Sequence, residues 1–599
     1  MNSGQWRVRG NLILFAVVVF VLPVIAHAAG TQKLHGHVPA VVARLQPVGS
    51  FSGSERLHLA IGLPLRNQTL LTELLQRIYN PASPDYHHYL TPEQFAKMFG
   101  PTEQDYQAVV TFAKAHGLTV TGTHPNRMLL DVDGSVTDIE KAMHVKMHVY
   151  RHPKEARTFY APDAEPSLDL AVPVLHISGL NNYALPRPRF QASPIANITK
   201  VVPNAGSGLI GTYMGNDFRA AYVPYSSLTG SGQVVGLVQF DGYDASDITY
   251  YESQAGLPNI TLANVLLDGF DGFPTGNGNE IEVCLDIEMA ISMAPGLLEV
   301  IVYEAGPYGN WEDILNRMAT DNFAKQLGCS WYSPGMEANS VDDQIFQQMA
   351  AQGQSFFNAS GDSDASTGLI DFPGDSPYIT QVGGTILTTS GGGGAWVSET
   401  VWNDGDGNGS GGGVSTQYPI PAWQTDINMT TNQGSTTMRN TPDVALTAYN
   451  VYVRADGLDY IARGTSCASQ LWGGFAALVN QQAAADGRPP IGFINPAVYT
   501  IGMGTNYTSC FHDITTGDNT SPGSPDKFYA VAGYDLCTGW GTPAGQNLIN
   551  ALAGPSCGFT LSGDLNGDCR VDINDFAILA ENWLIDCTAD PNNPQCVPN

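Results

Sequence analysis

The chain has 599 residues and a formal net charge of −29 at pH 7, a balance that argues against nucleic acid as a partner. The acidic excess is concentrated in residues 200–556, which hold 9 basic and 35 acidic residues and one histidine, His512. A chain of this length exceeds a single hydrophobic core and is expected to form roughly two to four domains.

The first 28 residues have the pattern of a signal peptide. Arg7 and Arg9 precede an apolar run over residues 12–25, and Ala26-His27-Ala28 follows it. No later run reaches the ~18 apolar residues of a membrane-spanning helix. We therefore expect residues 1–28 to be removed, and the mature protein to be secreted without a membrane span.

Helical and strand-like patterns alternate over residues 35–190, which we predict to be a separate domain. The stretch 102–116 is amphipathic and follows Gly100-Pro101, which predicts a helix. The domain ends in the segment 185–189, Leu-Pro-Arg-Pro-Arg, which we interpret as an exposed linker.

Residues 200–555 are rich in glycine and small side chains. Short apolar runs at residues 234–240 and 299–303 alternate with helical patterns, which predicts an α/β domain with a parallel sheet and covering helices. The glycine-rich stretches 391–394 and 405–413 are predicted to be surface loops.

The lack of histidine limits the hydrolytic chemistry of this domain. No histidine occurs between residues 200 and 500. A Ser-His-Asp hydrolase needs one to accept the proton of its nucleophile, and a His-Glu-x-x-His zinc peptidase needs two. Any hydrolytic chemistry here must therefore use carboxylates.

Three motifs could supply such chemistry. Gly464-Thr465-Ser466 precedes a small-residue helix pattern, which places the Ser466 hydroxyl at a helix N-terminus, where backbone N–H groups can stabilise an oxyanion. An ordinary N-cap is the alternative. Asp362, in Ser-Gly-Asp-Ser at 360–363, follows an apolar stretch and could donate a hydrogen bond if protonated; otherwise it is a turn residue.

Glu282 and Asp286 form the third motif. A spacing of four puts both carboxyls on one helix face, where they can share a proton and one pKa rises. This gives a carboxylate base steadied by a protonated neighbour. The alternative is a solvated acidic face, although the surrounding residues are apolar. Glu280 and Glu288 are the neighbours most easily confused with the pair.

Together these motifs resemble the sedolisin family of serine-carboxyl peptidases, and most closely its kumamolisin-like bacterial members. The resemblance covers nearly the whole chain before residue 555. It rests on the three motifs above and on four shorter stretches: Ser330-Trp331, Phe372-Pro373 with Ser376-Pro377-Tyr378, Val382-Gly383-Gly384-Thr385 and Pro442-Asp443-Val444-Ala445.

The resemblance implies a subtilisin-like α/β fold and a set of roles. Glu282 would be the general base and then acid, Asp286 its partner, Ser466 the nucleophile and Asp362 the oxyanion donor. Protein or peptide substrates would bind along Ser330, Trp331 and Gly361. Because carboxyl bases work near their own pKa, activity is expected at about pH 3–5.

The resemblance also implies that residues 35–190 are an activation prodomain with an α+β, ferredoxin-like fold. Cleavage is expected between Pro186 and Gly206. We hypothesise that acid triggers release, because the 11 histidines of residues 30–199 would become charged below about pH 6.

Three positions depart from the family pattern. Gln470 stands where proline is common, and Asp364 stands where glycine often follows Asp-Ser. Gln239 occupies a position at which some members hold a supporting glutamate. These departures leave the cleavage specificity and the pH optimum open.

Calcium is the expected cofactor, at two places. In the peptidase domain the resemblance implies a structural calcium held by the side chains of Asp513 and Asp535 and the carbonyls of Ile514, Val531 and Gly533. Oxygen ligands suit this ion, and the alternative is an ordinary acidic loop.

The tail, residues 557–599, carries the second calcium motif. Its loop resembles one EF-hand-like repeat of a type I dockerin, although Cys569 replaces the usual glycine and we find one repeat instead of two. The tail could serve a cohesin-like or cell-surface partner, or only stabilise the protein. Its predicted ligands are Asp564, Asn566, Asp568, Arg570, Asp572 and Asp575.

Nine cysteines in an exported chain suggest disulfide bonds. Four lie in the tail, where a small core would need them. Cys510 and Cys537 flank one loop and could pair. The remaining three, Cys284, Cys329 and Cys467, leave at least one free thiol.

Two other functions remain open from the sequence. The first is a non-catalytic exported scaffold that keeps the fold, and digestion of a denatured protein at acid pH would distinguish it. The second is an esterase or acyltransferase with the same Ser-Glu-Asp set, which the comparison of peptide and ester turnover would reveal.

Overall fold

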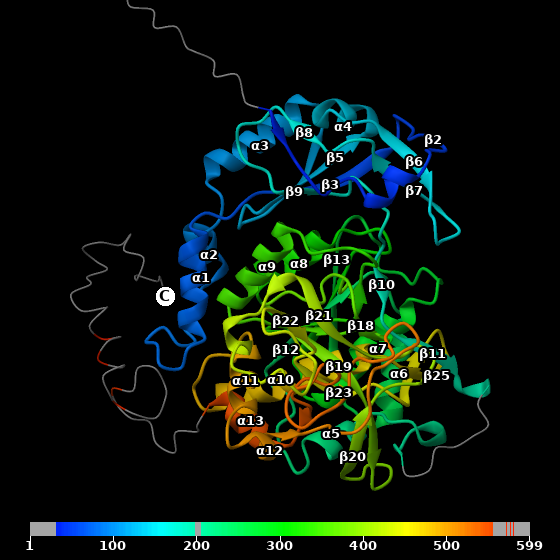
Figure 1. The fold of residues 1–599 in the computed structure, drawn as a ribbon, viewed down its shortest axis with the longest axis vertical. Coiled ribbons are helices and arrows are strands. Elements are labelled where there is room, and N and C mark those ends of the chain that lie inside the picture. The colour runs from blue at the N-terminus through cyan, green and yellow to red at the C-terminus, as the bar shows by residue number, and fades with distance from the viewer. Residues whose placement is uncertain are drawn as a thin grey trace, which may run out of the picture.

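The computed structural model describes residues 31–197 and 205–554, together with the single residues 563, 571, 576 and 579. Two units are visible in Figure 1, a smaller one coloured blue to cyan and a larger one coloured green to orange. The predicted signal peptide and the six predicted calcium ligands of the tail lie outside the described residues.

The smaller unit contains a four-stranded antiparallel sheet of order β4-β5-β3-β9. These strands are β3 (Arg56–Gly62), β4 (Thr119–Thr123), β5 (Leu129–Ser135) and β9 (His176–Ser178). Helices α3 (Glu103–Ala115) and α4 (Val136–Met143) supply apolar side chains to its core, which is separate from that of the larger unit. The amphipathic helix predicted at 102–116 is confirmed as α3, whose N-cap Thr102 accepts a hydrogen bond from Asp105 N.

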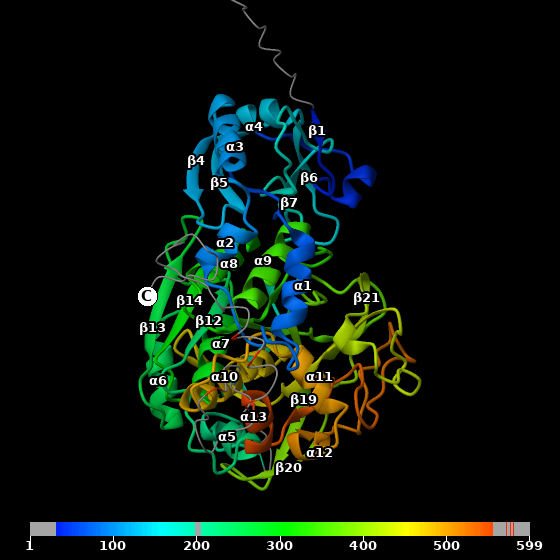
Figure 2. The ribbon, with the colours of Figure 1, turned by 90° about the vertical axis from the view of Figure 1, so that its left-hand side faces the viewer.

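Further short elements complete this unit. A three-stranded sheet pairs β2 (Gly49–Ser50), β6 (Met147–Arg151) and β7 (Thr158–Pro162), and β1 (Gln32–Lys33) pairs with β8 (Ser167–Leu168). Helices α1 (Gln68–Ile78) and α2 (Pro92–Met98) leave the sheet and run along the larger unit (Figure 2), beside α9 (Ser340–Ala351) and α8 (Trp311–Asp321). Leu71 of α1 and Phe95 of α2 belong to the core of the larger unit.

The larger unit is a mixed α/β structure built on an eight-stranded sheet. Seven strands follow the order β13-β14-β12-β15-β17-β19-β20, and β23 pairs beside β19. All pairs are parallel except β19 with β20. The strands are β12 (Val234–Gln239), β13 (Thr261–Leu266), β14 (Glu299–Glu304), β15 (Gln326–Cys329), β17 (Ser355–Ala359), β19 (Thr380–Thr389), β20 (Trp396–Val401) and β23 (Val444–Thr447).

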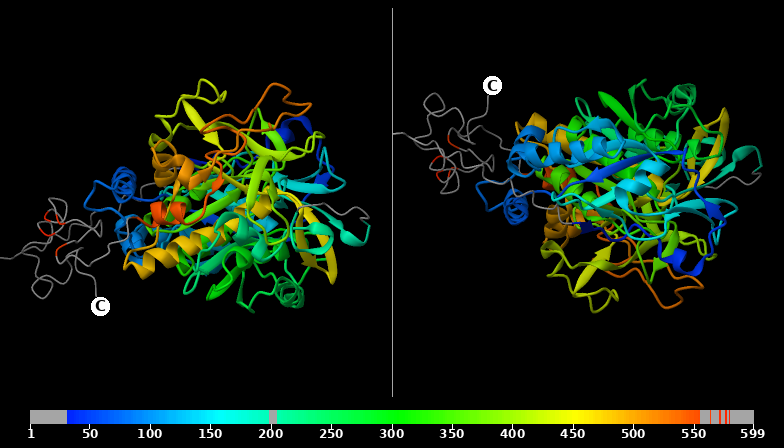
Figure 3. Two further views of the ribbon diagram at one scale, coloured as in Figure 1. Left: turned by 90° about the horizontal axis from the view of Figure 1, so that it is seen from below. Right: turned by 90° about the horizontal axis from the view of Figure 1, so that it is seen from above.

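Helices cover this sheet, as the alternating patterns predicted. The helix α10 (Thr465–Ala485) packs across β15, β17, β19 and β23 and against α7 (Glu280–Met293). The pair α8 (Trp311–Asp321) and α9 (Ser340–Ala351) lies between the sheet and the smaller unit, which stands at one end of the long axis (Figure 1). The two units overlap when the molecule is seen along that axis (Figure 3). The other helices are α5 (Asn216–Tyr222), α6 (Ala245–Ala255), α11 (Asn495–Gly502), α12 (Tyr507–Cys510) and α13 (Gln546–Ala553).

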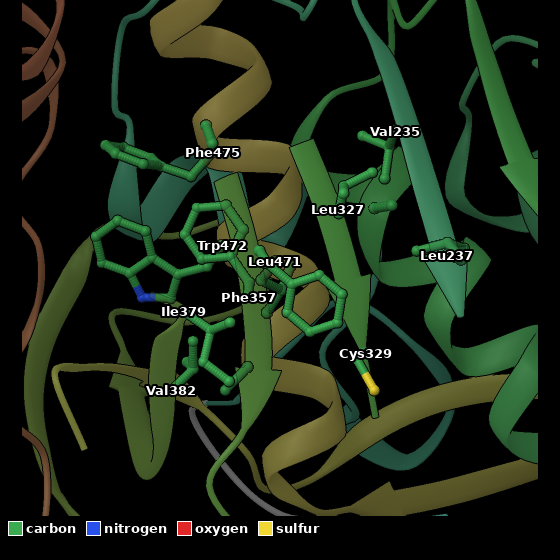
Figure 4. Packing of buried hydrophobic residues seen from close by; sticks show 14 of the residues in the cluster. Val235, Leu237, Leu327, Cys329, Phe357, Ile379, Val382, Leu471, Trp472 and Phe475 are labelled. Atoms are coloured by element: carbon green, nitrogen blue, oxygen red, sulfur yellow. The ribbon is translucent and has the colours of Figure 1, made fainter. Parts of the chain in front are cut away.

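The core between α10 and the sheet fixes the helix that carries Ser466. Figure 4 shows Leu471, Trp472 and Phe475 of α10 packed onto Phe357 of β17 and Val382 of β19. All five side chains are fully buried. Burial of this apolar area is the main stabilising contribution to the helix position.

One glycine-rich stretch was predicted wrongly. Residues 391–394 do form a turn between β19 and β20, but residues 409–413 open strand β21 (Gly409–Pro419), which lies between β18 (Ser363–Ser366) and β22 (Met438–Thr441). A Cβ on Gly412 would lie 1.9 Å from the carbonyl oxygen of Leu536, and one on Gly411 would lie 2.5 Å from that of Ser360. The glycines therefore serve close backbone packing instead of a flexible loop.

The predicted disulfide is also wrong. Cys510 and Cys537 are both free, buried thiols, as are Cys284, Cys329 and Cys467. Cys510 ends α12, whereas Cys537 lies in a turn that is fixed by hydrogen bonds to Asp535. No helix of the two described ranges combines the length and hydropathy needed to cross a membrane.

Candidate active site

Ser466 is the second residue of α10 and is fully buried. Its Oγ lies 2.9 Å from Glu282 Oε2 and also contacts the carbonyl oxygen of Arg189. Gly464 precedes the helix with φ of 153°, a conformation that a side chain would disfavour. The helix N-terminus therefore presents the hydroxyl to both a carboxylate and a peptide carbonyl.

Glu282 lies in the first turn of α7, and every residue from Glu282 to Met293 is buried. The predicted alternative of a solvated acidic face is therefore excluded. Helices α7 and α10 approach closely at Gly474. A Cβ there would lie 2.7 Å from Met293 Cβ, so only glycine permits this distance. This contact between helices holds Glu282 at hydrogen-bonding distance from Ser466.

Asp286 lies one turn further along α7 and accepts two hydrogen bonds. Ser330 Oγ donates to Oδ1 at 2.6 Å, and Gln239 Nε2 donates to Oδ2 at 2.7 Å. Trp331 Nε1 in turn donates to Gln239 Oε1 at 2.8 Å, and Gln470 Nε2 donates to Ser330 Oγ at 3.0 Å. Gln239 and Gln470, which stood out in the sequence only as departures, therefore belong to the network behind the pair.

Each of the two carboxyls affects the proton binding of the other. Burial, and then repulsion by Asp286, raise the pKa of Glu282 well above its usual range. Burial also raises the pKa of Asp286, against the opposing hydrogen bonds from Ser330 and Gln239. Those donors favour the ionised form of Asp286, while burial makes the pair as a whole bind protons more readily than two isolated carboxylates.

Asp362 follows β17 and faces the start of α10. Its Oδ1 accepts hydrogen bonds from Thr465 N at 2.9 Å and Thr465 Oγ1 at 2.8 Å. Burial raises its pKa to about 7, although the Thr465 bonds and the charge of Arg189 oppose the shift. Oδ2 is buried without a partner among the described residues and is the oxygen left to carry the proton.

The predicted substrate strand is occupied by the chain itself. Strand β10 (Arg187–Pro188) runs antiparallel to β16 (Trp331–Tyr332), and Arg189 N donates to Ser330 O at 3.0 Å. Beyond Ser466, β11 (Gln191–Pro194) pairs antiparallel with β25 (Leu458–Arg463). The segment predicted to be an exposed linker therefore runs through the site, because the backbone on either side of Arg189 pairs with the edges of β16 and β25.

Arg189 is the functional residue that the sequence reasoning missed. Its side chain is only 7% exposed, and its guanidinium carbon lies 4.3 Å from the centre of the Tyr332 ring. The charge run Arg187-Pro-Arg189 was its only signal, and a charge run ordinarily predicts a solvated segment. A cavity of about 320 Å³ adjoins the side chain and is lined by Tyr332, Gly361 and Asp364, among others.

The predicted calcium ligands of the peptidase domain lie on two neighbouring loops, residues 513–514 and 531–535. Gly533 N donates to Asp513 Oδ1 and Oδ2 at 3.2 and 3.1 Å, and Val531 N donates to Asp535 Oδ2 at 3.1 Å. Asp535 is fully buried, and its burial raises its pKa to about 7. Within the described residues, no N–H group donates to the carbonyls of Ile514, Val531 or Gly533. This set of two carboxylates and three carbonyl oxygens fits the oxygen ligands that Ca²⁺ prefers.

Comparison with known proteins shows which proteins the chain resembles. Residues 43–183 match the family model of the pro-kumamolisin activation domain. The chain is 29% identical over 544 residues to kumamolisin of Bacillus sp. (strain MN-32), covering 87% of this chain and 96% of that protein. It is 30% identical over 565 residues to xanthomonalisin of Xanthomonas sp. (strain T-22), covering 83% of this chain and 65% of that protein.

Among solved structures, Pseudomonas sedolisin complexed with two molecules of pseudo-iodotyrostatin matches with a TM-score of 0.48 and 24% identity, covering 58% of this chain and 98% of that one. The relatives are serine-carboxyl peptidases that are made with an activation domain. The chain is thus similar over most of its length to kumamolisin and xanthomonalisin, and its residues 43–183 match the pro-kumamolisin activation domain.

Proposed function

We propose that this protein is a secreted serine-carboxyl endopeptidase that is made as a proenzyme and acts at acid pH. The observation that carries the proposal is the 2.9 Å hydrogen bond between Ser466 Oγ and Glu282 Oε2 in a buried cluster of carboxyls. His512 instead stacks on Trp396, with 3.9 Å between ring centroids. A carboxylate must therefore take the proton of the nucleophile.

In this mechanism Ser466 Oγ attacks the carbonyl carbon of the substrate and passes its proton to Glu282. Glu282 then donates that proton to the departing amine, and it activates the water that hydrolyses the acyl-enzyme. Because a protonated Glu282 cannot act as a base, the proton that the pair holds must lie on Asp286 when Ser466 attacks. The pair therefore works only while it holds one proton.

Asp362 supplies the oxyanion donor. A Cβ on Gly464 would lie 2.5 Å from Arg189 O and 2.8 Å from Asp362 Oδ2, so this carboxyl oxygen and the peptide carbonyl border the same space. With its pKa raised to about 7, Asp362 is neutral below that pH and can donate from Oδ2. Above it the carboxylate would repel the oxyanion, so activity is lost as the pH rises through about 7, and we expect an optimum at about pH 3–5.

Substrate backbone would replace residues 187–189 on the strand edge formed by Ser330 and Trp331. Gly361 completes the wall, since a Cβ there would lie 2.4 Å from Arg189 Nη1. The prodomain thus blocks the site until it is removed, and its β-α-β-β-α-β order of elements favours the ferredoxin-like fold expected for it.

Calcium would be held by Asp513, Asp535 and the carbonyls of Ile514, Val531 and Gly533. When bound, it would neutralise two carboxylates and link two loops, which is a structural contribution. Secretion, the calcium loop of the tail and a cohesin-like or cell-surface partner remain predictions from the sequence.

Mass spectrometry of purified full-length protein at pH 4 tests the proposal. We expect the parent protein to release its prodomain and to digest an added denatured protein. The variant Ser466→Ala should do neither. Ser509→Ala, at an exposed serine, is the matched control and should cleave normally. Intact parent protein after hours at pH 4 would contradict the proposal, and turnover of esters without turnover of peptides would indicate the esterase alternative.

A further inference from the structure

A cluster of histidine and aspartate side chains joins the two units. His58, on β3 of the smaller unit, contacts two carboxyls of the larger one: its Nε2 lies 3.1 Å from Asp313 Oδ2 and 3.6 Å from Asp268 Oδ1. Asp313 lies in the first turn of α8, and Asp268 follows β13. Figure 1 shows β3 above the end of the larger unit that carries α8 and β13. The cluster therefore lies at the interface between the prodomain and the peptidase domain.

The spacing of these side chains suits a metal ion. One ligand atom from each of His58, Asp268 and Asp313 lies within 4.8 Å of the other two. Ligand atoms held at ~2.0–2.1 Å around a tetrahedral zinc ion lie about 3.3 Å apart. The two distances from His58 Nε2 are close to that value. Three of the four tetrahedral ligands are thus nearly in place, and a water molecule would supply the fourth.

Hydrogen bonds hold the other polar atoms of two of these ligands. Nδ1 of His58 lies 3.0 Å from Asp133 Oδ1, and Oδ2 of Asp268 accepts a hydrogen bond from Asn310 N at 2.7 Å. A histidine ligand of zinc ordinarily donates its other N–H to a carboxylate in this way, which fixes the orientation of the ring. The arrangement leaves Nε2 of His58 and Oδ1 of Asp268 as the ligand atoms.

Asp313 lacks the partners that a buried carboxyl requires. It is 3% exposed, and its Oδ1 has no hydrogen-bond partner among the described residues. Asp131 Oδ1, in the same cluster, is likewise buried without a partner in the described part of the chain. Burial of an uncompensated carboxylate is costly, so several such groups around His58 require a further positive charge.

A second group of possible ligands shares Asp313 and consists of His124, Asp131 and Asp313. His124 Nε2 lies 2.8 Å from Asp131 Oδ2, which is the distance of a hydrogen bond. Two ligands of one zinc ion do not approach each other so closely, because each lies ~2.0–2.1 Å from the metal. The group around His58 is therefore the better candidate.

We propose that His58, Asp268 and Asp313 bind a zinc ion that links the prodomain to the peptidase domain. One imidazole nitrogen with two carboxylates suits Zn²⁺, whereas Ca²⁺ and Mg²⁺ prefer oxygen ligands alone. A cavity of about 1260 Å³ between the two units is lined by His58 and Asp268 and gives the ion a route to the site. The site is separate from the calcium loops of Asp513 and Asp535, and it does not depend on the peptidase function proposed above.

Equilibrium dialysis of full-length Ser466→Ala protein against zinc chloride at pH 7, with calcium present, tests the proposal. We expect a zinc ion that His58→Gln and Asp268→Asn, each made in this background, bind at least about 10-fold more weakly. The two variants remove one ligand from either unit, so a folding defect in one leaves the other informative. His88→Gln, at an exposed histidine, is the matched control and should bind zinc like the Ser466→Ala protein.

Two further measurements identify the ligands and the link. X-ray absorption at the zinc edge should show nitrogen and oxygen neighbours at ~2.0–2.1 Å and no sulfur, which separates this site from binding by cysteine. Zinc should also slow hydrogen exchange in β3 and α8 together, because the ion joins both units.

The outcomes decide between a metal site and a simple ion pair. Absence of bound zinc, zinc held only by sulfur, or equal binding by His58→Gln, Asp268→Asn and the control overturns the site. His58 would then only form ion pairs with the two carboxyls. Protection confined to one unit overturns the link between them. Ser466→Ala protein cannot cleave itself, so none of these results bears on the peptidase assignment.

Discussion

His37 makes the prodomain sensitive to acid. It is 1% exposed, its Nε2 accepts a hydrogen bond from Ile177 N at 3.0 Å, and its ring stacks on His176 with 4.3 Å between centroids. Burial, and then the charge of His176, lower the pKa of His37 to about 3, although Glu165 opposes the shift. Protonation at Nε2 would remove the acceptor of the Ile177 bond, so the fold requires the neutral ring.

The sign and size of the effect follow from this shift. Because the pKa of His37 is lowered from about 6.5 in the unfolded chain, its stabilising contribution is complete above that pH and declines as the pH falls towards 3. At pH 4 the unfolded state binds the proton and the folded state does not. At ~1.4 kcal/mol per pH unit over about 2.5 units, the loss between pH 7 and pH 4 is about 3 kcal/mol.

Hydrogen exchange in Ser466→Ala protein, which stays uncut, measures this loss as the opening free energy of β9 at pH 7 and pH 4. We expect a decrease of about 3 kcal/mol attributable to His37, which disappears in His37→Gln because glutamine accepts the Ile177 bond without titrating. His144→Gln, at an exposed histidine, should behave like the parent. An equal decrease in His37→Gln and in the parent would refute the reasoning.

The remaining predictions concern the site and its support. Gly464→Ala should slow self-cleavage by roughly 100-fold, because the new Cβ would lie 2.5 Å from Arg189 O, and gel analysis at pH 4 measures it. Chelation of calcium should lower the thermal midpoint of Ser466→Ala protein by roughly 5 °C or more, and Asp535→Asn should remove this sensitivity. Phe357→Ala should reduce the free energy of unfolding by about 3–5 kcal/mol in denaturant titration, because the side chain is fully buried against Trp472.

Each of these changes has a matched control. Gly232→Ala alters another left-handed glycine with no atom within 4 Å and should cleave at the parent rate. Excess calcium should restore the midpoint after chelation, and a midpoint indifferent to calcium would contradict the metal assignment. Phe273→Ala, at a side chain 72% exposed, should change stability by less than about 1 kcal/mol, and an equal loss at both positions would contradict the core argument.

Local patterns predicted much of this molecule. The helix that starts beside Ser466, the buried helix of Glu282 and Asp286, and the parallel sheet all follow from periodicity and burial, which depend on neighbouring residues. The glycine stretch 405–413 was misread because the same residues serve flexible turns and close packing. The tertiary neighbours, such as Leu536 beside Gly412, decide between the two.

Long-range contacts account for what the sequence could not predict. Arg189 and Ser466 are 277 positions apart, and no local pattern announces that they meet. The prodomain histidines likewise differ by environment. Hydrogen bonds and charges of Asp313 and its neighbours overcome burial and raise the pKa of His58 to about 10, whereas burial keeps His37 and His176 neutral to about pH 3–4. The hypothesis that all 11 become charged together is therefore wrong.

The close contact of α7 and α10 has a consequence for how the reactive distance is maintained. Gly474 lies eight residues beyond Ser466, about 12 Å along the helix axis, and it lets α10 settle against Ala290 and Met293. The distance between Ser466 Oγ and Glu282 Oε2 is therefore set by how closely the two helices pack at Gly474. A methyl group added at Gly474 would separate these two oxygen atoms without contacting either of them.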